Sequence, residues 1–295
     1  MRRSGGDLEQ PHLGPDLGHP ILFFLLACAV SWAAWLPLAW AVTSNPGTQP
    51  GGLQYSHLLG ALGPLTAAYL VTAWTEGWRG LERLTRRSFR SRVGWQWLTF
   101  VLVGPTLMYL AAVLGLGIFT GDWSSLSHYG ESLEYPELPR PLYWVSNLVF
   151  YGFGEEVGWR GYLIPRLQTR WSAVGAALLF TPFWAIWHLP LFWAAPGLSQ
   201  MTTPGIAGWV MSLALGSVLL SWLFNATGSV VPAAIFHGTI DIAFTSPGPA
   251  MLQTMLGAEV TLLALGIILF LDSGTLRTRR RWVNRKRETA AKPPC

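Results

Sequence analysis

The stretch PLYWVSNLVFYGFGEEVGWRGYLI, residues 141–164, decides the fold, because it is long enough to cross a membrane yet carries charge. A membrane-spanning helix needs about 20 predominantly apolar residues. A charged side chain near the bilayer centre costs roughly 2.5–3.5 kcal/mol on insertion scales, so we expect Glu155, Glu156 and Arg160 to face the protein interior. The stretch therefore predicts a membrane helix packed among others, with its polar groups turned inward.

The composition of the whole chain agrees with lipid as its solvent. Of 295 residues, 51% are apolar and only 12% are charged, whereas soluble domains carry about 25% charged residues. The net charge is +5, but the basic residues lie in short clusters between long apolar runs. This pattern is typical of membrane-protein loops, so we expect membrane lipids as partners and no nucleic acid.

Seven further apolar runs flank the stretch 141–164 and bring the prediction to about eight transmembrane helices. These runs are 21–42, 56–75, 94–119, 173–195, 206–224, 229–245 and 251–271. The predicted fold class is all-α, a polytopic membrane helical bundle. Residues 20–275 form one membrane domain, between a flexible cytoplasmic tail at 1–19 and a basic cytoplasmic tail at 276–295. The segment 78–92, with six arginines, predicts a short amphipathic helix on the membrane surface.

The distribution of arginine predicts the orientation. With the N-terminus inside, the segments predicted to lie outside hold a single arginine, Arg140, and the remaining loops and tails hold all the others except Arg160, which lies within a span. Cytoplasmic loops carry an excess of Lys and Arg. We therefore expect an integral protein of a bacterial cytoplasmic membrane, with both termini cytoplasmic. No short feature of the sequence fixes the oligomeric state.

Two carboxylates in the stretch 141–164 are predicted to have different roles. Glu156 and Arg160 are four residues apart and share a helix face, so we expect them to pair. Glu155 is rotated by about 100° from Glu156. It is therefore left free to act as a general base or acid.

Further polar groups lie in two other predicted spans. His188 is in the fifth span, and His237 and Asp241 share a helix face in the seventh. Pro182 and Pro190 flank His188 and are expected to bend its helix. Ionisable groups converging from three spans predict an intramembrane active site.

Two chemistries and one non-catalytic class suit these residues. In one chemistry, Glu155, His188 and His237 bind a divalent metal, zinc in particular, that activates water. In the other, Glu155 activates water directly, His188 orients it, and His237 with Asp241 stabilises the oxyanion. The alternative is a proton-coupled transporter or a non-catalytic membrane immunity or scaffold protein, although the chain shows no internal repeat of the kind common in transporters.

Three motifs resemble those of the CAAX prenyl protease and bacteriocin-processing (Abi) family of intramembrane proteases. GEEVGWRGYL, 154–163, resembles the EExxxR motif, and WAIWHLP, 184–190, resembles a second motif with an aromatic residue four before His. HGTID, 237–241, resembles a third, His-x-x-x-Asn. The resemblance covers roughly 140–245. Trp184 stands where Phe is more usual, and Asp241 where Asn is common.

The resemblance implies a membrane domain of about eight helices with a cavity open to the membrane and cytoplasm. It implies an endopeptidase, metal-dependent or glutamate-dependent, whose substrate is a membrane-associated or lipidated peptide or protein. Glu155 would be the water-activating base, with Glu156 and Arg160 as its structural partners. His188 would assist, and His237 with Asp241 would bind the oxyanion.

Overall fold

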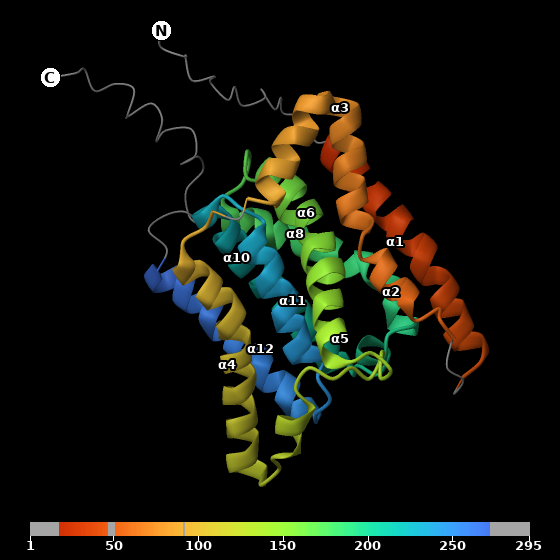
Figure 1. Ribbon diagram of the computed structural model, residues 1–295, viewed down its shortest axis with the longest axis vertical. Helices are drawn as coiled ribbons and strands as arrows, with labels where there is room; N and C mark the ends of the chain where they lie inside the picture. Colours follow the sequence, from red (N-terminus) through yellow and green to blue (C-terminus); the bar gives the residue numbers. More distant parts are fainter. Residues whose placement is uncertain (1–17, 47–50, 91, 272–295) are drawn as a thin grey trace, which may run out of the picture.

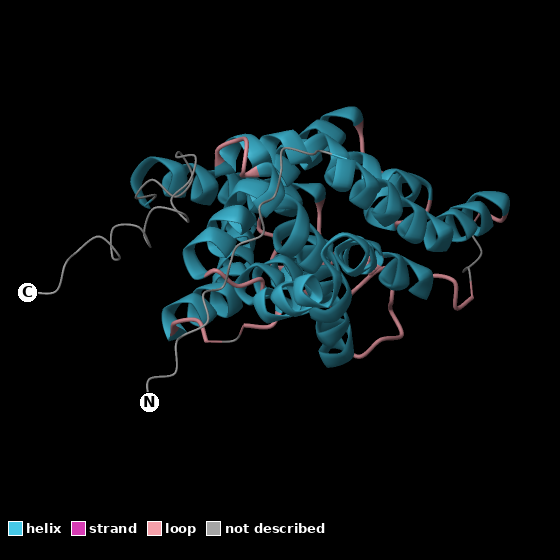
Figure 2. Cartoon of the chain, turned by 90° about the horizontal axis from the view of Figure 1, so that it is seen from above, coloured by secondary structure: helices cyan, strands magenta, loops and turns pink. Residues whose placement is uncertain are grey.

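The computed structural model describes residues 18–46, 51–90 and 92–271, and every regular element in these ranges is a helix (Figures 1 and 2). The predicted all-α membrane bundle is therefore confirmed. The basic tail predicted at 276–295 and nearly all of the tail predicted at 1–19 lie outside the described residues.

Five stretches of the described chain are long and apolar enough to cross a membrane. They comprise α1 (Gly18–Ser44), α2 (Tyr55–Gly60) with α3 (Gly63–Ser88), α4 (Trp95–Thr120), α10 (Thr203–Thr227), and α12 (Ala250–Gly266) with η5 (Ile267–Leu271). Two shorter apolar helices are α8 (Ala173–Trp187) and α11 (Val231–Thr245). The connections carry η1 (Ser124–His128), η4 (Leu189–Trp193) and α9 (Pro196–Ser199).

The stretch 141–164 lies in one continuous helical path, in which α-helical and π-helical segments alternate. It runs through α5 (Arg140–Ser146), η2 (Asn147–Phe153), α6 (Gly154–Gly158), η3 (Trp159–Leu163) and α7 (Ile164–Leu167). The elements η2 and η3 are π-helical, so the turn bearing Glu155 and Glu156 lies between two widened turns. Such π-helical turns are frequent at functional sites. With this path, the helices correspond to the eight predicted apolar runs.

Glycines allow neighbouring helices to approach this path closely. Figure 1 shows α5 and α6 between α11 and α3. A Cβ on Gly158 would lie 2.5 Å from the carbonyl carbon of Pro64 in α3, and one on Gly152 would lie 2.4 Å from the carbonyl oxygen of Ala234 in α11. Small residues at such contacts allow backbones to pack tightly in membranes. The two carboxylates of α6 are thereby enclosed by protein.

One helix differs from the sequence expectation. The helix predicted over 173–195 ends at Trp187 and does not bend around His188, which caps it. Pro190 has no N–H with which to continue the helical hydrogen bonds, so the chain turns into η4 instead.

The short helix predicted at 78–92 is present as the second half of α3, which ends at Ser88. It folds back on the first half at Gly77, whose φ of 60° suits glycine (Figure 1). Its position on the membrane surface stays a prediction.

Substitution of Gly158 by Ala tests this packing. The added methyl group meets both backbone and ring atoms of Pro64, so we expect a loss of about 1–3 kcal/mol of stability from overpacking. The matched control is Gly208→Ala in α10, where a Cβ meets nothing within 4 Å. Thermal unfolding in detergent should show a lower midpoint for Gly158→Ala alone, and equal midpoints for both variants would contradict the close contact.

Candidate active site

Glu156 lies at the centre of an ion-pair network whose core is buried. Its Oε1 accepts a hydrogen bond from Nη1 of Arg160 at 2.7 Å and lies 2.9 Å from Nδ1 of His237. Glu156 and Arg160 are both 0% exposed. The pairing predicted from their spacing of four residues is present, and the contact with His237 is an addition from α11. An unpaired buried charge is costly, so moving Arg160 or His237 away from this carboxylate would cost free energy. The carboxylate therefore fixes the positions of both residues.

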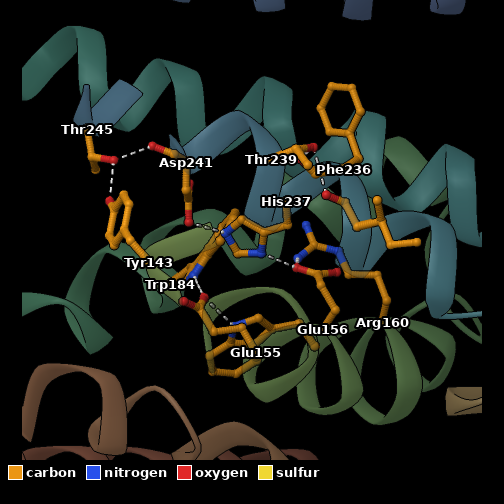
Figure 3. A network of polar contacts seen from close by, with 12 residues as sticks. Tyr143, Glu155, Glu156, Arg160, Trp184, Phe236, His237, Thr239, Asp241 and Thr245 are labelled. Carbon is orange, nitrogen blue, oxygen red and sulfur yellow. Dashed lines mark hydrogen bonds and ion pairs between the residues drawn. The ribbon is translucent and has the colours of Figure 1, made fainter. Parts of the chain in front are cut away.

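His237 lies between two carboxylates (Figure 3). Its Nδ1 faces Glu156, and its Nε2 lies 3.5 Å from Oδ2 of Asp241. Ionised carboxylates only accept hydrogen bonds, and an imidazole donates from both nitrogens only when it is protonated. The surroundings of His237 therefore suit an imidazolium. Asp241 is the more open member, with 31% of its side chain exposed.

Glu155 is held differently from its neighbour, by neutral donors. Its Oε2 accepts the indole N–H of Trp159 at 3.2 Å and that of Trp184 at 3.0 Å. Its Oε1 accepts no hydrogen bond within the described part of the chain. Glu155 is only 3% exposed. The expectation of a carboxylate free of any partner is thus corrected: Glu155 has no cationic hydrogen-bond partner there, but two indoles fix one of its oxygens.

His188 and Trp184 complete the site from the end of α8. Nδ1 of His188 lies 2.7 Å from the carbonyl oxygen of Trp184, which can only accept, so Nδ1 carries the proton and Nε2 is an acceptor. The ring of Trp184 lies 6.1 Å from that of His188 and 5.6 Å from that of His237, between centroids. One indole thus contacts both histidines and donates to Glu155, so the three predicted segments meet at Trp184 (Figure 3).

Sequence reasoning missed the two indole donors. Trp159 follows Glu155 by four residues, the same spacing that identified Glu156 and Arg160 as a pair. Trp184 was noted only as an aromatic residue of the second motif. In both cases the signal was present, but the indole N–H was not considered as a partner for a buried carboxylate.

The predicted metal ligands do not gather into a metal-binding group. Among the described residues, no three His, Cys, Asp or Glu side chains lie together so that they could hold a metal ion. Nδ1 of His237 is taken by Glu156 and Nδ1 of His188 by a carbonyl. The zinc expected on Glu155, His188 and His237 stays a prediction.

Comparison with known proteins agrees with the motifs. Residues 137–243 match the family model described as type II CAAX prenyl endopeptidase Rce1-like, and all six predicted site residues fall inside this range. The chain is also 25% identical over 232 residues to a CAAX prenyl protease 2 of Methanococcus maripaludis, an alignment that covers 76% of this chain and 83% of the relative.

Replacement of Arg160 by Met tests the buried network. Met keeps much of the length of the side chain but leaves the buried carboxylate of Glu156 without its arginine, so we expect a loss of about 3–5 kcal/mol of stability. The matched control is Arg86→Met, because Arg86 pairs with Glu82 at the surface, where ion pairs contribute little. Denaturant titration in detergent measures both, and similar small losses would contradict a structural role for the buried pair.

Proposed function

We propose that this chain is an intramembrane endopeptidase of the CAAX prenyl protease family, whose model matches residues 137–243, and that Glu155 activates water to hydrolyse a peptide bond. Its substrate is a membrane-associated or lipidated peptide or protein. One observation supports this most: Glu155 is buried, its Oε2 is fixed by two neutral donors, and its Oε1 accepts no hydrogen bond from any of the residues that the structure describes.

The attack on the substrate begins at Glu155. Oε1 takes a proton from a water molecule as the water oxygen bonds to the carbonyl carbon of the scissile peptide. Nε2 of His188 is an acceptor, so it orients the water by accepting its second hydrogen. The buried setting excludes other water molecules, which keeps the carboxylate and the attacking water in one arrangement.

His237 stabilises the negative charge of the tetrahedral intermediate. A protonated His237 donates from Nε2 to the oxyanion, while Glu156 holds Nδ1. Asp241, when ionised, cannot donate to an oxyanion, so its role is to orient the ring from 3.5 Å before the attack. The single N–H of Nε2 then turns to the oxyanion as its charge forms. The carbon–nitrogen bond then breaks, and the departing nitrogen receives the proton that Glu155 took from water. Arg160 stabilises Glu156 throughout and touches no reacting atom.

Substitution of Glu155 by Gln is expected to abolish cleavage. Gln keeps the size of the side chain and accepts the indole hydrogen bonds, but it cannot take a proton from water. A loss of roughly 10²–10⁴ in kcat follows from removing a general base. A peptide-library cleavage assay in detergent measures it, with Glu259→Gln as the matched control, since Glu259 lies in α12.

Three outcomes of this assay separate the proposals. Activity of Glu155→Gln equal to that of the unaltered protein would contradict Glu155 as the base. Loss of activity on addition of a chelator, restored by zinc, would favour the metal-dependent chemistry. No cleavage of any peptide by the unaltered protein would favour a non-catalytic scaffold or a transporter.

In the proposed topology both termini are cytoplasmic and the loop between α4 and α5 lies outside the cytoplasmic membrane. The loop 121–139 holds Asp122, Glu131, Glu134 and Glu137 and no Arg or Lys, whereas the second half of α3 is rich in arginine. This asymmetry supports the orientation.

Site-directed labelling tests the orientation. In a Cys295→Ser background, we expect a membrane-impermeant maleimide to label Leu133→Cys in intact cells and to leave Glu82→Cys unlabelled until the cells are opened. Leu133 is 67% exposed and the side chain of Glu82 50%, so both sites are reachable, while the native Cys28 is buried. The reverse pattern would invert the topology.

A further inference from the structure

Two indole N–H groups from different helices converge on one carboxylate oxygen. Trp159 in η3 and Trp184 in α8 both donate to Oε2 of Glu155, at 3.2 and 3.0 Å. An indole N–H is a donor only and carries no charge. The adjacent Glu156 is instead bonded to a guanidinium and an imidazole. Glu155 is thus bonded to neutral donors, whereas Glu156 is bonded to cationic ones.

Neutral donors restrict a carboxylate without supplying a countercharge. With both indoles on Oε2, rotation of the Glu155 carboxylate about its last bond would break two hydrogen bonds, so Oε1 stays in one direction. A cationic partner would fix the group as well, but it would also compete with a proton for it. Fixing by indoles therefore leaves the carboxylate available for proton transfer.

The two indoles are themselves immobilised by close packing. Trp159 is 0% exposed, and its ring centroid lies 4.9 Å from that of Phe180 and 5.6 Å from that of Trp187. Trp184 is 3% exposed and stacks on Phe180 at 5.4 Å, with the guanidinium carbon of Arg160 5.0 Å from its ring centroid. Side chains locked in this way hold a reacting group within tight geometric limits.

We infer that Trp159 and Trp184 are positioning residues whose paired N–H groups hold Oε2 of Glu155 so that Oε1 faces the attacking water. The inference rests on the proposed function, because it assigns the indoles a part in activating water. Neither tryptophan touches the reacting atoms. Loss of an N–H should therefore slow the chemical step and leave substrate binding unchanged.

Trp→Phe substitutions isolate the N–H groups, since Phe keeps an aromatic ring and removes the donor. We expect Trp184→Phe and Trp159→Phe each to lower kcat roughly tenfold to a hundredfold, the scale of one hydrogen bond to a charged group, with KM within about twofold. The matched control is Trp222→Phe. Trp222 is half-buried in α10 and packs against Trp97 and Phe100, not against Trp159 or Trp184. Its kcat should change less than about twofold.

A second measurement does not depend on activity. The infrared carboxyl bands of Glu155, assigned by their loss in Glu155→Gln, should shift in Trp184→Phe and in Trp159→Phe but not in Trp222→Phe. Two single variants keep the test open if one of them does not fold. Unshifted bands in the folded variant would overturn the inference.

The outcomes for this inference and for the proposed function are distinguishable. If Glu155→Gln is inactive while Trp184→Phe and Trp159→Phe match Trp222→Phe in kcat, the inference is wrong and the proposed function stands. A rise in KM with kcat unchanged would also overturn it, because the indoles would then act on binding. If Glu155→Gln retains full activity, the proposed function fails and the inference fails with it.

Discussion

Two adjacent carboxylates buried in an apolar helix are the constraint on which the rest of this structure depends. Burial of a charge in a membrane domain is costly unless partners are supplied at hydrogen-bond distance. Glu156 meets this requirement with Arg160 on its own helix and His237 on α11. The same contacts that stabilise the charge also connect the path 140–167 to α11, so the fold and the site share one set of interactions.

The two buried carboxylates have different hydrogen-bond partners, and these partners suit them to different roles. Glu156 is enclosed by cationic groups, which suits a residue that stays ionised and holds others in place. Within the described ranges, Glu155 is hydrogen-bonded only to indoles, through one oxygen, which suits a residue that exchanges a proton. Their neighbouring positions on a helix make this possible, because successive side chains point in directions about 100° apart.

Helix packing brings these groups to hydrogen-bond distance. The widened turns of η2 and η3 and the glycines at 152 and 158 let α3 and α11 approach the turn that carries the carboxylates. The early end of α8 is equally important, because Pro190 stops the helix and leaves His188 at its cap, beside the ring of Trp184. The apolar run alone suggests that the helix continues through His188. In such a helix the His188 side chain would point in a different direction.

The sequence by itself determined the membrane class, the helical runs and the contacts along single helices. Glu156 with Arg160, and His237 with Asp241, follow from a spacing of four residues, because the geometry of a helix is fixed locally. Only the tertiary structure decided which helices meet, and so the bonds of Glu156 to His237 and of Glu155 to Trp184. These depend on how closely and at what rotation two helices pack, which small residues such as Gly158 set at contacts distant in sequence.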